Sequence, residues 1–132
     1  MLFDNVFLSY TVVDSCCIIT YKEGARIDYE VGQSIIEEKK RLQKVINIKK
    51  FIGVIDSSVR IDKSIMKQFA TKDALDGVDM IGVVFTSKNK LIRLGQRLGV
   101  QVLNGLIVFN KTTPPKTKFF YNQRTALNWM NK

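Results

Sequence analysis

Hydrophobic and polar positions divide the chain into short apolar runs that alternate with amphipathic stretches. Two β-rich runs, Val6–Val13 and Cys16–Tyr21, are joined by Asp14-Ser15, which predicts a β-hairpin. From Tyr29 to Ile46 the apolar residues keep the spacing of one helix face, and charged residues fill the other face. Asp28 precedes this stretch and is the predicted N-cap of the helix.

The chain is organised around the apolar strand pattern Phe51–Ile55, which lies between Lys49-Lys50 and Asp56-Ser57-Ser58. A short apolar run with polar residues at both ends is typical of a central strand that is covered on both faces. In open α/β sheets, binding sites lie at the carboxyl ends of such strands. The pattern therefore places the candidate site directly after Ile55.

The remaining elements continue the alternation of helices and strands. They are a helix from Lys63 to Asp76 with Asp62 as N-cap and Gly77 at C′, a strand over Val78–Phe85, a helix over Lys88–Phe109, a strand over Thr117–Tyr121 and a terminal helix capped by Asn122. Gly105 leaves open an alternative in which the long helix ends there and Leu106–Phe109 forms a strand. The order ββαβαβαβα predicts one α/β domain over residues 1–132, with a mainly parallel sheet of about five strands, an antiparallel hairpin at its edge and about four helices.

Composition narrows the class of protein and of chemistry. With 45% hydrophobic residues, the 132-residue chain can bury the core of one domain. Its apolar runs are too short for a bilayer, and the start MLFDN lacks a signal-peptide pattern, so we expect a cytoplasmic protein. Cys16 and Cys17 are adjacent and point to opposite faces of a strand, which disfavours a disulfide. Since the chain has no histidine, zinc sites and catalytic triads are disfavoured, and we expect no metal, cofactor or catalytic residue.

The net charge of +9 is concentrated in the last third of the chain. Residues 1–87 contain 12 basic and 12 acidic residues, whereas residues 88–132 contain nine basic residues and no acidic one. This distribution predicts an anionic partner, either an anionic lipid surface or an acidic protein surface, with a merely solubilising surface as the alternative. The candidate anion-binding residues, at the start of the long helix, are Lys88, Lys90, Arg93 and Arg97. Nucleic acid is not expected, because the aromatic residues of this third are spaced as core positions.

In several short segments the chain resembles the STAS domain of anti-sigma-factor antagonists. These segments are GVIDSS at 53–58, Ile61-Asp62-Lys63-Ser64, VDMIGVVF at 78–85, the Pro114-Pro115 loop, Lys118-Phe119-Phe120 and Ala126-Leu127-x-Trp129. The chain is also similar to small uncharacterised bacterial proteins grouped with that family, which in turn resemble the lipid-carrying Sec14 (CRAL-TRIO) domains.

The resemblance implies a STAS-like fold and a non-enzymatic regulatory module that docks a protein partner through Asp56–Ser64. In anti-sigma-factor antagonists the helix starts Asp-Ser-Ser-Gly and its second serine is phosphorylated, a position that Ser64 occupies here. Lys63 and Ile65 depart from the family pattern. The candidate phosphorylation and partner residues are Ser64, Asp56, Ser57, Ser58 and Asp62.

Two other functions remain open from the sequence. The similarity to lipid-binding domains and the very apolar stretch Leu91–Phe109 suggest a carrier of an apolar ligand, or a helix covered in a homodimer. An enzyme is the weaker alternative, because N-capping explains Asp28 and Asp62 and no second type of catalytic group accompanies the carboxylates.

Overall fold

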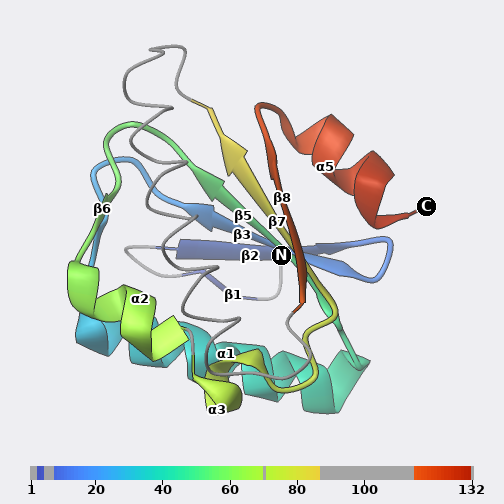
Figure 1. The fold of residues 1–132 in the computed structure, drawn as a ribbon, viewed down its shortest axis with the longest axis horizontal. Helices are drawn as coiled ribbons and strands as arrows, with labels where there is room; N and C mark the ends of the chain where they lie inside the picture. Colours follow the sequence, from blue (N-terminus) through green and yellow to red (C-terminus); the bar gives the residue numbers. More distant parts are fainter. Residues whose placement is uncertain (1–2, 5–7, 70, 87–114, 132) are drawn as a thin grey trace.

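A six-stranded sheet forms the centre of the structure, a computed structural model that describes residues 3–4, 8–69, 71–86 and 115–131. The strand order is β1-β2-β3-β5-β7-β8 (Figure 1). The strands are β1 (Phe3–Asp4), β2 (Leu8–Val13), β3 (Cys16–Tyr21), β5 (Lys50–Ile55), β7 (Met80–Phe85) and β8 (Lys116–Phe120). β1, β2 and β3 pair antiparallel, whereas β3, β5, β7 and β8 are parallel. This confirms the predicted sheet, with the two-residue β1 added at its edge.

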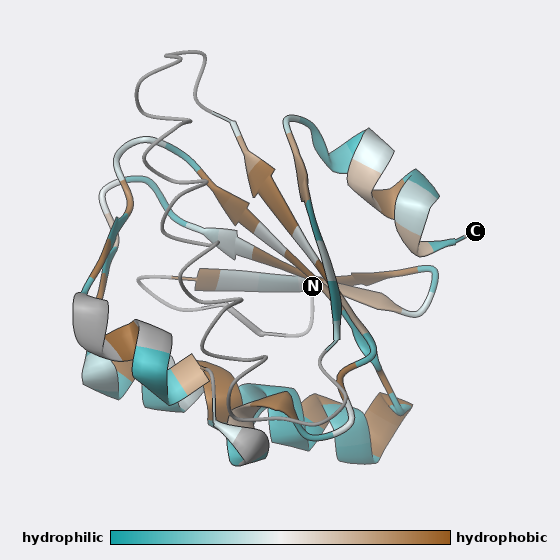
Figure 2. Ribbon diagram, viewed as in Figure 1, coloured by the Kyte–Doolittle hydropathy of each residue, from teal (hydrophilic) through white to brown (hydrophobic). Residues whose placement is uncertain are grey.

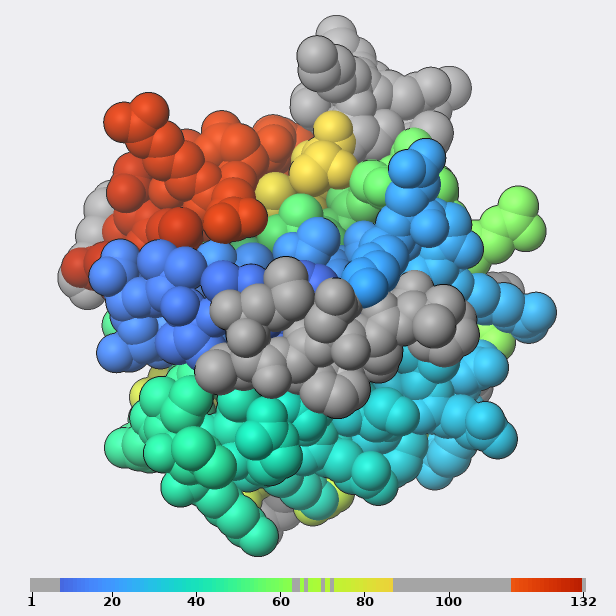
Figure 3. Space-filling model, turned by 180° about the vertical axis from the view of Figure 1, so that it is seen from behind, coloured from blue at the N-terminus to red at the C-terminus, as the bar shows by residue number. Residues whose placement is uncertain are grey.

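Helices cover both faces of the sheet. α1 (Tyr29–Ile46), α2 (Lys63–Phe69) and α3 (Lys72–Leu75) lie on one face, and α5 (Gln123–Met130) lies on the other (Figure 1). Seen from behind, the blue N-terminal strands form a band between α1 and α5 (Figure 3). The central strands are largely hydrophobic, while much of α1 is hydrophilic on its outer side (Figure 2). This three-layer arrangement requires apolar side chains on both faces of the central strands.

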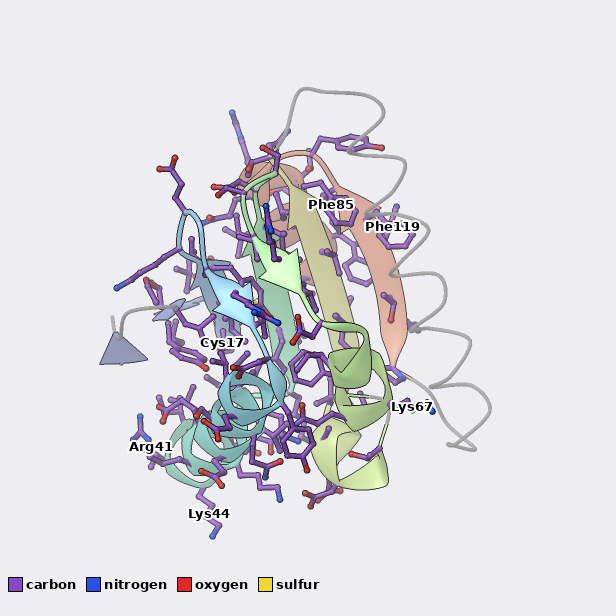
Figure 4. All side chains as sticks on the ribbon, turned by 90° about the vertical axis from the view of Figure 1, so that its left-hand side faces the viewer. Cys17, Arg41, Lys44, Lys67, Phe85 and Phe119 are labelled. Atoms are coloured by element: carbon purple, nitrogen blue, oxygen red, sulfur yellow. The ribbon has the colours of Figure 1, made fainter. Side chains whose placement is uncertain are left out.

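Alternation along the strands divides the core into two layers. On the α1 face, Phe51 and Cys17 pack with Leu42 of α1. On the α5 face, Ile52 and Cys16 pack with residues that include Val84, Ala126 and Met130. The adjacent cysteines therefore point to opposite faces, as predicted, and both are free and buried. Figure 4 shows Cys17 on the side of the sheet that carries α1.

A buried lysine joins α1 to the end of α3. Lys39 Nζ donates to the carbonyl oxygens of Ala74 at 2.7 Å, Asp76 at 3.0 Å and Asp73 at 3.4 Å. The last carbonyls of a helix lack partners within the helix, and a cation there also interacts favourably with the helix dipole. Lys39 thus fixes α3 against α1, and the three carbonyl oxygens provide hydrogen-bond acceptors for its buried ammonium group.

Local signals placed several elements correctly. α1 and β3 have the predicted bounds. Asp28 caps α1 by accepting from Val31 N at 3.0 Å, and Asn122 caps α5 by accepting from Thr125 N at 2.9 Å. The hairpin turn has positive φ at both Asp14 and Ser15, as two-residue turns with right-handed strand twist require. Gly77, the predicted C′ residue, has φ +72°.

The helix predicted over Lys63–Asp76 is wrong as a single element, because α3 starts independently of α2. Thr71 takes an extended conformation, accepts from Ala74 N at 3.2 Å and donates to Gln68 O at 2.9 Å, so that it caps α3. The strand predicted from Val78 starts at Met80, since Val78 N donates to Leu75 O in the turn after α3. The helix predicted over Lys88–Phe109, with its alternative ending at Gly105, lies outside the described residues.

The two buried thiols should make the free energy of unfolding fall at alkaline pH. Burial raises the pKa of Cys17 to about 12, with further increases from Cys16 and Glu38. Burial also raises the pKa of Cys16 to about 11, although nearby Lys50 opposes the rise. A thiol in the unfolded chain ionises near pH 9 and the folded thiol does not, so the unfolded state binds fewer protons above that pH.

We expect the thiol contribution to stability to be complete below pH 9 and to be lost as pH rises toward the folded pKa values. The slope should be up to about 1.4 kcal/mol per pH unit for each thiol. The measurement is the free energy of unfolding by denaturant from pH 8 to pH 10, compared between wild type and a Cys16→Ala, Cys17→Ala variant. Equal slopes in the two proteins would contradict this linkage.

Candidate functional site

The chain leaves the carboxyl end of β5 and follows a short path to α2, called here the β5–α2 segment (residues 56–62). Within it, β6 (Arg60–Ile61) pairs in parallel with β4 (Arg26–Ile27), the extended residues before α1. Arg60 N donates to Ala25 O at 2.9 Å, and Asp62 N donates to Ile27 O at 3.0 Å. Figure 1 shows β6 running down toward the start of α2. Two segments far apart in sequence therefore form one surface.

Asp56 and Ser58, two of the predicted partner residues, hold this segment in shape. Asp56 Oδ1 accepts from Ser58 N at 2.7 Å and from Ser58 Oγ at 2.5 Å. Ser58 Oγ in turn accepts from Gly24 N at 2.7 Å, across 34 residues of sequence. Gly24 has φ +75°, a conformation that favours glycine. The carboxylate and hydroxyl thus join two loops, while Ser57 between them is exposed.

An apolar side chain anchors the same segment from below. Val59 is half-buried and packs against the apolar cluster of Ile55, Val83 and Phe85 near the carboxyl ends of β5 and β7. Phe85 stacks on Phe119 of β8, with ring centroids 6.0 Å apart, and Figure 4 shows the two rings on neighbouring strands. Packing below and hydrogen bonds to the Gly24 loop together fix the backbone of the β5–α2 segment.

Two arginines that the sequence analysis did not single out complete the surface. The β4–β6 register pairs Arg26 with Arg60, and both side chains are exposed. Arg26 Nε and Nη2 each lie 3.4 Å from a carboxylate oxygen of Asp62. A signal was present in the sequence: the tripeptide Arg-Ile-Asp occurs at residues 26–28 and again at 60–62, each time directly before a helix.

The other predicted site residues are only partly placed. Asp62 directly precedes α2, and its carbonyl accepts from Ile65 N at 3.0 Å. Ser64 lies in the first turn of α2, where the structure describes its backbone and not its side chain. The predicted anion-binding residues lie outside the described part of the chain; they are Lys88, Lys90, Arg93 and Arg97.

A shallow groove lies beside this surface, between α1 and the α2–α3 pair. Its lining comes from Tyr29, Gln33 and Ile36 on α1 and from Lys67, Gln68, Thr71 and Asp73 on the other side. Gln68 is buried, and its Nε2 donates to Tyr29 O at 3.1 Å and to Gln33 Oε1 at 3.2 Å. Its Oε1 lies over Gly32, where a larger residue would collide with it. Asp73, one of the lining residues, forms a 2.6 Å ion pair with Lys40 of α1.

Among the described residues, no three acidic or cysteine side chains gather as metal ligands would. None of the helices in that part of the chain has the length and apolarity needed to span a bilayer. The nearly buried carboxylate of Glu38 is engaged by Arg41 Nε at 3.0 Å. The β5–α2 segment is the place where exposed polar and apolar side chains are presented on a fixed backbone.

We expect the strand before the segment to matter far more for stability than the hydroxyl that fixes the segment. Ile55→Ala should lower the free energy of unfolding by about 2–5 kcal/mol, because Ile55 is 9% exposed within an apolar cluster. Ser58→Ala should cost about 1 kcal/mol, the net value of a lost hydrogen bond. Val45→Ala, at a side chain that is 69% exposed, is the control. Denaturant midpoints that place Ser58→Ala below Ile55→Ala would contradict the burial assigned to β5.

Comparison with known proteins identifies the fold. No protein-family model matches the sequence, and no curated protein matches it either. The structure is similar to the crystal structure of an uncharacterised protein of the DUF3478 family from Shewanella loihica PV-4, described as having a SpoIIAA-like fold. The TM-score is 0.53 over 98% of both chains, at 13% sequence identity. The chain thus has the SpoIIAA-like, or STAS-like, fold that its resemblance to STAS domains implied.

Proposed function

We propose that this protein is a non-enzymatic regulatory module that docks a protein partner through the β5–α2 segment and the start of α2. The observation that carries the proposal is the fixed backbone of this segment. Asp56, Ser58 and Val59 face inward to hydrogen bonds or packing, whereas Ser57, Arg60 and Ile61 are exposed. A preformed surface binds with little ordering cost, which favours recognition of a partner.

Exposure of Ile61 adds the apolar contact that a protein interface needs. Its side chain is 37% exposed, although its cross-strand neighbour Ile27 is fully buried. Interfaces combine a small apolar centre with a polar rim, and Arg60 and Ser57 would supply that rim. Ser64 follows in the first turn of α2, so its phosphorylation would change the charge at the border of this surface.

A carrier of an apolar ligand is the second candidate, and the described groove does not favour it. The groove is open to solvent, and the Gln33 and Gln68 amides lie along it. A lipid chain needs a largely apolar enclosure. The apolar stretch that suggested a carrier or a homodimer, Leu91–Phe109, lies outside the described residues.

Site-specific photo-crosslinking tests the docking surface. A photoreactive phenylalanine analogue replaces Ile61 in one full-length variant and Val45, an equally apolar and more exposed residue of α1, in the control. In cells that naturally express the protein, we expect the Ile61 variant to form one dominant adduct with another protein and the Val45 variant to form none. Adducts of equal yield at both positions, or an adduct with a second copy of this chain, would contradict the proposal.

The same adduct reports on Ser64. Ser64→Asp should change its yield by several fold relative to Ser64→Ala, while the thermal midpoint changes little, because a first-turn anion suits the helix dipole. Equal yields in the two variants would remove the phosphorylation switch and leave the docking surface in place. A co-purified lipid mass in native mass spectrometry would instead favour the carrier.

A further inference from the structure

The two Arg-Ile-Asp tripeptides form a small surface whose arginine side chains are not needed for the pairing of their strands. Their pairing in β4 and β6 places Arg26 and Arg60 side by side, and Ile27 beside Ile61. Ile27 is fully buried, and backbone hydrogen bonds from Arg60 N and Asp62 N hold the two strands together. These contacts account for the pairing without any contribution from the arginine side chains.

Like charges on neighbouring strands repel each other, so the arginine pair (Arg26 and Arg60) costs stability unless an anion lies near both. Asp62 serves Arg26 only loosely, at 3.4 Å, and the Arg26 side chain remains 70% exposed. Arg60 is exposed and has no ion pair among the described residues. Arg60 is therefore an exposed guanidinium without an ion-pair partner among the described residues, next to an Arg26 that Asp62 holds only at 3.4 Å.

We propose that the arginine pair binds a carboxylate of an acidic segment in the partner protein. Guanidinium groups are planar donors that grip a carboxylate through two parallel hydrogen bonds, and two adjacent groups offer such a fork on each side of one anion. This inference rests on the proposed docking function and adds the chemistry of the partner.

The surroundings of the pair favour protein carboxylates over a continuous polyanion. Each tripeptide ends in an aspartate, so Asp28 and Asp62 border the arginines with negative charge. A membrane surface or a nucleic acid presents phosphates over a wide area and would meet these carboxylates as well. A single acidic side chain on a peptide can approach the arginines and avoid the aspartates.

A peptide titration of the isotope-labelled full-length protein tests the assignment. The probe is a synthetic peptide of alternating glutamate and leucine residues, and its counterpart carries glutamine in place of each glutamate. We expect the acidic peptide to shift the NMR signals of the Arg26 and Arg60 side-chain Nε–H groups, and the glutamine peptide to bind at least tenfold more weakly. Shifts confined to other parts of the molecule would overturn the proposal.

Variants with matched charge separate the pair from the net charge of the protein. Arg26→Gln with Arg60→Gln should weaken binding of the acidic peptide at least tenfold. Lys44→Gln with Arg124→Gln removes the same charge from exposed positions on α1 and α5 and should change binding less than twofold. Figure 4 shows Lys44 pointing away from the sheet. Equal weakening by both double variants would overturn the proposal.

Two further arms keep the test decisive. Arg60→Gln alone alters a side chain without an ion pair among the described residues, so it tests binding if the double variant does not fold; it should weaken binding at least threefold. Arg26→Lys with Arg60→Lys keeps the charge and loses the fork, and wild-type affinity in that variant would overturn the assignment to paired guanidiniums. Vesicle binding is the last comparison. If wild type and the Lys44→Gln, Arg124→Gln variant bind anionic phospholipid vesicles and the Arg26→Gln, Arg60→Gln variant does not, the protein carboxylate is overturned as the ligand.

The Ile61 adduct distinguishes this inference from the docking function. If the Arg26→Gln, Arg60→Gln variant forms that adduct as efficiently as wild type, the carboxylate assignment is wrong and the docking surface stands. If the photoreactive Ile61 variant with both arginines intact forms no adduct, the docking function fails. The peptide titration still reports whether the arginine pair binds carboxylates.

Discussion

The structure depends on the enclosure of β5. Parallel neighbours occupy both of its edges, β3 on one side and β7 on the other, and apolar layers cover both of its faces. A strand enclosed in this way can place polar groups only beyond its ends. Since parallel strands end at the same edge, the residues after Ile55 emerge beside those that follow β3 and β7. The burial of β5 therefore determines where the candidate surface lies, whatever side chains that surface carries.

Position alone does not give the surface a shape, and here a second set of interactions does so. Ser58 joins the segment to Gly24, and β6 pairs with β4, so the residues before α1 and those before α2 are held as one unit. Further along the chain, Lys39 joins α1 to the end of α3, where its ammonium group donates to the last carbonyls. The segment has a defined shape because helices and loops on the α1 face hold one another, and a preformed surface loses little conformational freedom on binding, which is why the proposed docking function is assigned to it.

The sequence predicted what short-range patterns determine. β3, α1 and the caps at Asp28 and Asn122 depend on alternation, helical periodicity and one side chain, so they could be placed closely. β4 and β6 have two residues each and show no period; they form because two distant backbones meet. The break before α3 was legible in Thr71, a good N-cap, but helical spacing continued across it. At the site, the sequence does not distinguish a carboxylate or hydroxyl that binds a partner from one that forms hydrogen bonds within its own loop, as Asp56 and Ser58 do.

The same reasoning explains why bulk charge gave an incomplete picture of the surface. Residues 1–87 balance 12 basic against 12 acidic side chains, which suggested a neutral part of the molecule with the positive charge elsewhere. Folding sorts those charges by position: Lys39 is buried on carbonyls, Lys40 pairs with Asp73, and Arg41 engages Glu38, whereas Arg26 and Arg60 are brought together in the open. Electrostatic recognition depends on such local arrangements, because screening limits the reach of exposed charges to about 10 Å. A repeated tripeptide that meets its own copy across two strands brings two guanidinium groups together within that range, although each copy also carries an aspartate.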